Sequence, residues 1–128
     1  MKIILAGSMI SFEKMKLIKQ RLEANGVVVA MPTGAGDSSP QVVRGFNHDA
    51  LERLKSGDRL LVVNEEKQGV KGYVGSNTLI EIGMAFALGK PVYLLNDYDK
   101  TQDCTDELDA LVDGIVGGDI LKWLKEAV

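Results

Sequence analysis

The sequence has 128 residues, of which 45% are apolar and 26% charged, and this composition is typical of an ordinary globular domain with one core. The formal net charge is -3, and lysine and arginine are scattered along the chain, so the concentrated positive charge that binds nucleic acid polymers is missing. We therefore expect a single domain over residues 1–128 that does not bind a polynucleotide.

The cysteine count and the apolar runs indicate the compartment. Cys104 is the only cysteine, which excludes an intrachain disulfide and a cysteine-based zinc site and suits a reducing environment. Gly7, Ser8 and Glu13 interrupt the apolar start before a secretory signal core is complete. No apolar run approaches the roughly 18 residues of a membrane-spanning helix. We expect a cytoplasmic protein that does not contact a membrane.

The first half of the chain alternates apolar runs with helical patterns. Lys2–Ala6 is a short continuous apolar run, which is typical of a buried parallel strand, and Gly7 and Ser8 end it. The segment 32–40 is rich in glycine, proline and small polar residues, which indicates a loop. The predicted elements are a strand over 2–6, a helix over 11–25, a strand over 27–31, this loop and a helix over Pro40–Ser56.

The second half continues the alternation. A glycine-containing loop over 65–75 precedes the helix that carries Glu81, and an apolar run follows that helix. The predicted elements are a strand over 59–64, the loop over 65–75, the helix with Glu81, a strand over 90–96, a helix over 104–114, a short strand within 114–118 and an amphipathic helix over 119–128 with Ile120, Leu121 and Leu124 inward.

Alternating strands and helices with short connections predict an α/β fold, a flavodoxin-like or Rossmann-like three-layer sandwich with a parallel sheet of about five strands. In such sheets ligands bind beyond the carboxyl ends of the strands, near the point where the strand order reverses. The loops at that edge are the Gly7-Ser8 turn, 32–40, 65–77 and Asn96-Asp97. Chemistry is expected there.

Glu81 is a carboxylate inside an apolar helical run, and two explanations remain open. Thr78 and Glu81 form the pattern T-x-x-E, a capping box in which the threonine caps the helix and the glutamate reaches back to its amide. The helix also begins at the ligand-binding edge, where its dipole would keep Glu81 ionised, as a nucleophile must be.

Other carboxylates lie near helix or strand ends, and cleavage of a glycosidic bond commonly uses two carboxyl groups. Asp58 precedes a predicted strand, so we expect it at the opposite edge of the sheet. Asp49 lies inside the second helix, and Asp97 follows the fourth strand at the ligand-binding edge. His48 is the only histidine, and a lone histidine on a helix is more often a surface residue than a catalyst.

Three segments, in their order and spacing, give the chain a family likeness. They are "IILAGSM", "HDALERLKSGDRLLVVN" and "GYVGSNTLIEIGMAFALGKPVYLLN", and they span most of the sequence. With these segments the chain resembles the nucleoside 2-deoxyribosyltransferase superfamily, which includes the 2'-deoxynucleoside 5'-phosphate N-hydrolases. The third segment is similar to the "GYIG-S-T-x-x-E-I" variant of small members.

The resemblance implies a catalytic role for Glu81. The glutamate of the family's "E-I/L-G-x-A" segment attacks the anomeric carbon, releases the base and forms a covalent glycosyl-enzyme, which water or a second base resolves. Asp49 is the nearest equivalent of an aspartate that assists in several members, although its interval to Asp58 differs from the family's. Members also place an aromatic residue, often tyrosine, after the first strand, where this chain has Met9, Ile10 and Phe12, with Ser8 as the only hydroxyl of the turn.

The resemblance also implies how a substrate is held. A 5'-phosphate would lie near the Gly7-Ser8 turn and the start of the Glu81 helix, where backbone amides suit an anion. The loop with Lys67 and Lys71 either closes over the substrate or is simply solvated. The candidate substrate-binding residues are Gly7, Ser8, Gly75, Ser76, Asn77 and, from its place at the strand end, Asn96.

We therefore expect an enzyme that cleaves or transfers at the N-glycosidic bond of a (deoxy)nucleoside or its 5'-monophosphate through Glu81, with no metal and no other cofactor. Its partner is then a small-molecule nucleoside or nucleotide, and the resemblance to small members implies a homo-oligomer, a dimer or higher. Two alternatives remain. One is a nucleotide-binding or sensing module that keeps the pocket without the chemistry, and the other is a flavodoxin-like domain in which Glu81 only caps its helix.

Overall fold

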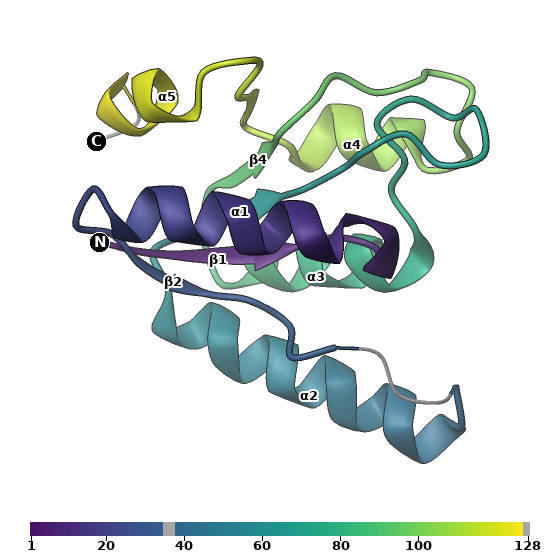
Figure 1. The fold of residues 1–128 in the computed structure, drawn as a ribbon. Helices are drawn as coiled ribbons and strands as arrows, with labels where there is room; N and C mark the ends of the chain where they lie inside the picture. The colour runs from purple at the N-terminus through teal and green to yellow at the C-terminus, as the bar shows by residue number, and fades with distance from the viewer. Residues whose placement is uncertain (35–37, 127–128) are drawn as a thin grey trace.

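The computed structural model describes residues 1–34 and 38–126 and contains a five-stranded sheet in the order β2-β1-β3-β4-β5 (Figure 1). All four strand pairs are parallel. The elements are β1 (Lys2–Ala6), the 3-10 turn η1 (Met9–Ser11), α1 (Phe12–Glu23), β2 (Val28–Ala30), α2 (Pro40–Ser56), β3 (Arg59–Val62), α3 (Ser76–Ala87), β4 (Val92–Leu94), α4 (Thr105–Leu111), β5 (Gly114–Ile115) and α5 (Ile120–Glu126). The predicted flavodoxin-like α/β sandwich is confirmed.

The side chains of the sheet belong to two separate hydrophobic clusters, one on each face. In β1, Ile3 and Leu5 pack with residues of α1 and α5, whereas Ile4 and Ala6 pack with residues of α2, α3 and α4. This alternation follows from the two-residue period of a strand. Because both faces are covered, the inner strands are continuous apolar runs, as the sequence of β3 shows.

The ends of several elements differ from the predictions. The helix predicted from residue 11 begins at Phe12 after the turn η1. The strand β1 has its predicted bounds, whereas β2, β3 and β4 are shorter than the predicted strands over 27–31, 59–64 and 90–96. In α5, Ile120 is buried as predicted, but Trp123 is the second buried residue, and Leu121 and Leu124 pack only partly against the cluster. Of the predicted loop over 32–40 and helix over 119–128, residues 35–37 and 127–128 lie outside the described part.

The capping-box interpretation of Glu81 is wrong. The helix α3 begins at Ser76, its N-cap is Gly75, and no side chain caps it. Thr78 therefore lies inside the first turn, where it is buried, and Glu81 lies in the second turn. The carboxylate of Glu81 cannot reach back to the first amide from there, so it must be explained by something other than a helix cap.

The loop between β3 and α3 is fixed against the next strand end at Gly72. Gly72 has φ +62°, and a Cβ at this position would lie 2.2 Å from the carbonyl oxygen of Asp97 and 2.6 Å from Cα of Tyr98. Its carbonyl accepts a hydrogen bond from Nε2 of Gln102 at 3.0 Å. Glycine at residue 72 is thus required by both backbone conformation and space.

We expect Gly72→Ala to lower the free energy of unfolding by about 2–4 kcal/mol, because it adds left-handed strain and a backbone clash. Gly45→Ala is the matched control, since a Cβ at Gly45 in α2 meets no atom within 4 Å. That control should be neutral or stabilising by up to about 1 kcal/mol. Urea denaturation measures both, and equal stability of the two variants would contradict the packing described here.

Candidate active site

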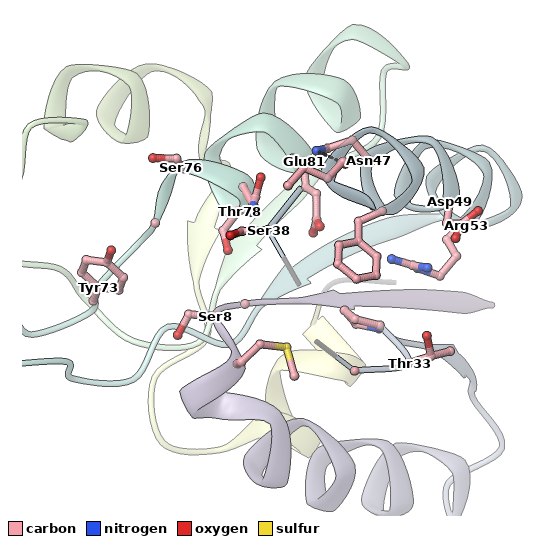
Figure 2. Close-up of a pocket in the computed structure, with 18 of the residues that line it drawn as sticks. Ser8, Thr33, Ser38, Asn47, Asp49, Arg53, Tyr73, Ser76, Thr78 and Glu81 are labelled. Atoms are coloured by element: carbon pink, nitrogen blue, oxygen red, sulfur yellow. Dashed lines mark hydrogen bonds between the residues drawn. The ribbon is translucent and has the colours of Figure 1, made fainter. Parts of the chain in front are cut away.

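A cleft of about 430 Å³ opens at the carboxyl edge of the sheet, between the end of β1 and the helices α2 and α3 (Figure 2). Four segments line it: the turn after β1, the loop after β2, one side of α2, and the loop after β3 with the start of α3. The lining residues are Gly7, Ser8, Met9, Pro32, Thr33, Gly34, Ser38, Val43, Phe46, Asn47, Asp49, Arg53, Lys67, Tyr73, Gly75, Ser76, Asn77, Thr78 and Glu81.

The cleft brings together most of the predicted site residues. Glu81 and Asp49, the predicted catalytic pair, line it from α3 and α2. The predicted substrate-binding residues of two separate turns also line it, namely Gly7, Ser8, Gly75, Ser76 and Asn77. His48 is exposed on α2 and does not line the cleft.

Asn96 does not line this cleft, and its amide is engaged elsewhere. Its backbone N–H donates to Oδ1 of the buried Asn64 at 2.9 Å, and its own Nδ2 donates to the carbonyl of Asn64 at 3.1 Å. Asn64 in turn donates to the carbonyl of Asn96 at 2.8 Å. These reciprocal hydrogen bonds connect the end of β3 to the end of β4, so Asn96 stabilises the sheet edge outside the cleft.

The other two acids also lie away from the cleft. Asp58 accepts a hydrogen bond from the backbone N–H of Lys2 at 2.7 Å, at the amino ends of β1 and β3, as predicted for the opposite edge. Asp97 is exposed, accepts from the backbone N–H of Tyr98 at 2.9 Å and lies 3.5 Å from the ammonium group of Lys100. Both carboxylates are explained by local structure.

Glu81 is partly buried in the wall of the cleft. No hydrogen bond or ion pair within the described residues engages its carboxylate. Burial raises the pKa of Glu81 to about 7, and the nearby positive charge of Arg53 opposes this rise. Glu81 therefore keeps its proton to a higher pH than an exposed glutamate does.

The prediction that the helix dipole would keep Glu81 ionised is therefore wrong, because the pKa of Glu81 is raised. The dipole acts mainly on the first turn of a helix, and Glu81 lies in the second turn of α3. Desolvation of the carboxylate outweighs the opposing charge of Arg53. The cleft therefore holds a glutamate whose pKa is raised by burial.

Arg53 is a cleft residue that the sequence did not single out. It lies one turn after Asp49 on α2, and Figure 2 shows its guanidinium extending from α2 into the space that Glu81 enters from α3. Nε of Arg53 is buried without a hydrogen-bond partner. Its spacing of four residues from Asp49 was the available signal, because residues i and i+4 share one side of a helix.

The end of the cleft beside the start of α3 carries hydroxyl groups and one cation. Tyr73 lies against Gly75, since a Cβ at Gly75 would be 3.3 Å from its hydroxyl oxygen. The ammonium group of Lys67 lies 5.0 Å from the ring centre of Tyr73, and Ser8 lines the same cleft. Because Gly75 leaves the first amides of α3 without a side-chain cap, this end suits an anionic group.

Lys67 is positioned by a tight turn. Its backbone N–H donates to the carbonyl of Val70 at 3.1 Å, and the N–H of Val70 donates back at 2.9 Å. Gln68 and Gly69 between them have φ angles of 51° and 81°. Lys71, the other lysine of this loop, is exposed and does not line the cleft.

Within the described residues, no group of three or more His, Cys, Asp or Glu side chains is arranged to hold a metal ion. None of the helices in the same part of the chain has the length and apolar character needed to cross a membrane.

No protein-family model and no curated protein matches the chain. Solved structures with a similar fold include a 2-deoxyribosyltransferase from the psychrotolerant bacterium Bacillus psychrosaccharolyticus, with a TM-score of 0.67 and 18% identity over 95% of each chain. The Clostridium botulinum CMP N-glycosidase BcmB is similar with a TM-score of 0.62 and 20% identity over 100% of each chain. The solution structure of BlsM is similar with a TM-score of 0.53 and 17% identity over 98% of this chain and 85% of that one.

At such low identity these similarities establish a shared fold. The similarity to BcmB extends over the whole length of the chain. The fold expected from the family resemblance is confirmed.

We expect the pH dependence of stability to report the burial of Glu81. Its pKa in the folded protein lies above the ordinary value of 4.5, so the protonated form favours folding, and this contribution is lost as pH rises from about 4.5 through about 7. Between pH 4.5 and pH 8, wild type should therefore lose up to about 3 kcal/mol of stability relative to Glu81→Gln. Urea denaturation across this range measures the difference, and parallel pH curves for the two proteins would contradict the assigned burial.

Proposed function

We propose that this protein cleaves or transfers at the N-glycosidic bond of a nucleoside or nucleoside 5'-monophosphate, with Glu81 as the nucleophile. The observation that carries the proposal is the Glu81 carboxyl group, which lies in the wall of the edge cleft and is engaged neither as a helix cap nor in an ion pair of the described residues. The fold shared with a 2-deoxyribosyltransferase and a CMP N-glycosidase supports the same class of reaction.

In the proposed first step, the carboxylate of Glu81 attacks C1' of the sugar. The bond between C1' and the base nitrogen breaks, and the bonding electrons leave with the base. The base takes up a proton from water, and the hydroxide ion left behind is neutralised by the proton released in the second step. The sugar is then bound to Glu81 through an ester bond. Only the ionised form of Glu81 attacks, and with a pKa of about 7 a large fraction is ionised at neutral pH.

In the second step, water or a second base attacks C1' and releases Glu81 as a carboxylate. Asp49 is exposed in the same cleft and is the second carboxyl group of the proposal, accepting the proton of the attacking water. Two displacements at one carbon retain its configuration. No metal or organic cofactor is required for this sequence of steps.

The substrate orientation follows from the chemistry of the two ends of the cleft. The sugar lies over Glu81, and a 5'-phosphate lies toward Lys67, Ser8 and the start of α3, where the donors suit an anion. The apolar side chains of Met9 and Phe46 line the cleft and are available to the base. The substrate is thus proposed to span the cleft from α3 to α2.

A second candidate function is binding of a nucleotide without turnover. Met9 lines the cleft after the first strand, where members of the resembled family place an aromatic residue, and it is 41% exposed. A flexible methionine gives weaker positioning of a base than an aromatic ring does. The methionine in place of an aromatic residue therefore favours a module that binds a nucleotide without turning it over.

The test is a chromatographic assay for free base with nucleosides, deoxynucleosides and their 5'-monophosphates. We expect release by wild type to fall about 10⁴-fold or more in Glu81→Gln and about 10²–10⁴-fold in Asp49→Asn. The rate should rise with pH through about 7, because the carboxylate form of Glu81 is the reactive one.

Asp58→Asn is the matched control, since Asp58 is a carboxylate at the opposite edge of the sheet, and it should keep full activity. Base release that persists in Glu81→Gln would contradict the mechanism. Absence of release from every compound, together with a clear thermal shift by one nucleotide, would favour the binding module.

We also propose that the chain forms a homo-oligomer. The helix α3 exposes the apolar side chains of Ile80 and Phe86, at 47% and 60% of their surface, and such side chains are common at subunit contacts. Light scattering after size exclusion should give at least a dimer for wild type, and Phe86→Glu should shift it toward monomer. A monomeric wild type would contradict this proposal.

A further inference from the structure

Arg53 is a cation with no partner in a partly buried wall. It takes part in none of the ion pairs formed within 4.0 Å by the described residues, and its Nε is buried without a hydrogen-bond partner. Burying this N–H group opposes folding, because the donor loses water and gains no hydrogen bond in return. Stability of the chain alone therefore does not explain arginine at this position.

Arg53 and Glu81 lie close enough to act on each other without touching. The positive charge of Arg53 opposes the rise in the pKa of Glu81, yet no nitrogen of Arg53 lies within 4.0 Å of the Glu81 carboxylate. The two groups point into the same space from α2 and α3 (Figure 2). A hydrogen-bond donor and an acceptor thus line the same cleft without contacting each other.

A hydroxyl group is the chemical group that can form hydrogen bonds with both Arg53 and Glu81. Its oxygen accepts a hydrogen bond from guanidinium, and its own hydrogen is donated to a carboxylate. A C–H group in the same place makes neither bond and leaves both charged groups unsatisfied.

The stereochemistry of a nucleoside identifies which hydroxyl this is. In the proposed reaction Glu81 attacks C1' from the face of the sugar opposite the base. In a ribonucleoside the 2'-hydroxyl lies on that same face and on the adjacent carbon, whereas the 3'-hydroxyl is one carbon further away. In glycoside hydrolysis, hydrogen bonds to the 2-hydroxyl strengthen in the transition state.

We propose that Arg53, facing Glu81 across the cleft, reads the 2'-hydroxyl, so that the substrate is a ribonucleoside or ribonucleotide in preference to its 2'-deoxy counterpart. This inference rests on the proposed function and adds the sugar class to it. The fold alone does not decide the point, because the similar structures include both a 2-deoxyribosyltransferase and a CMP N-glycosidase.

The test compares kcat/KM for matched ribonucleoside and 2'-deoxyribonucleoside 5'-monophosphates of each base. We expect wild type to favour the ribonucleotide about 100-fold, because sites built to bind a hydroxyl strongly reject its absence. In Arg53→Met the ratio should fall to within a few-fold of one. The ratio of the two kcat/KM values is taken within one variant. Any effect of the substitution on the ionisation of Glu81 or on folding then cancels, since it acts equally on both substrates.

Two controls sharpen the result. Lys67→Met removes another cation from the same cleft, at the end away from α2, and should leave the ratio unchanged even if both rates fall. Arabinonucleotides carry the 2'-hydroxyl on the other face of the sugar and should react as poorly as deoxynucleotides do. A wild type that prefers deoxynucleotides, or an Arg53→Met variant that keeps the wild-type ratio, would overturn the inference.

Failure of the proposed function is distinguishable from failure of this inference. If wild type cleaves no compound, calorimetric titration of wild type with the same matched nucleotides gives the ratio of their dissociation constants. Tighter ribonucleotide binding that Arg53→Met removes would support the reading of the 2'-hydroxyl without catalysis. Equal dissociation constants, or no binding of either nucleotide, would overturn it.

Discussion

Residues Ile3–Ala6 of β1 pair in parallel with Arg59–Val62 of β3, so the two strands end together at one edge of the sheet. Their packing there is close, because a Cβ at Gly7 would lie 2.6 Å from the carbonyl oxygen of Val63. This contact lets the turn after β1 lie against the loop that leads into α3. Ser8 and Gly75, which are far apart in the sequence, thereby line one cleft.

The cleft combines the desolvated carboxyl group of Glu81 with the cation of Arg53, whose charge only partly offsets the rise in the pKa of Glu81. Full pairing of Glu81 with Arg53 would lower the pKa of the carboxyl group and occupy the side chain that is proposed to attack. The observed separation leaves Glu81 without a partner in the described part of the chain, at a pKa of about 7. Such an arrangement opposes folding, and perturbed carboxyl groups of this kind concentrate at functional sites. The proposed chemistry at the cleft gives a reason for Glu81 at this position, and packing alone does not.

The sequence was most informative where one residue type decides the local structure. Pro40 at the first helical position and Gly57 after the last one predicted the bounds of α2 correctly. The start of α3 was less clear, because its N-cap is a glycine with no side chain, while the T-x-x-E pattern nearby imitates a cap. The parallel sheet and its layers of helices followed from the alternation of elements, since parallel strands require crossovers, whereas the alternation does not determine the strand order.

The details of the site depended on packing that the sequence does not encode locally. Asn96 was predicted from its place at a strand end, but its reciprocal hydrogen bonds with Asn64 span 32 residues. The spacing from Asp49 places Arg53 on the same side of α2, but only the packing of α2 beside α3 decides that this side faces the cleft. The pKa of Glu81 likewise depends on burial by residues from several segments.

The central claim is nucleophilic attack by Glu81, and the anomeric configuration of the first sugar product tests it most directly. Proton NMR recorded during hydrolysis of a β-nucleotide distinguishes the β-anomer from the α-anomer before they equilibrate. Two displacements through a glycosyl-Glu81 ester predict that the β-anomer appears first. Initial release of the α-anomer would mean direct attack by water and would contradict the role given to Glu81.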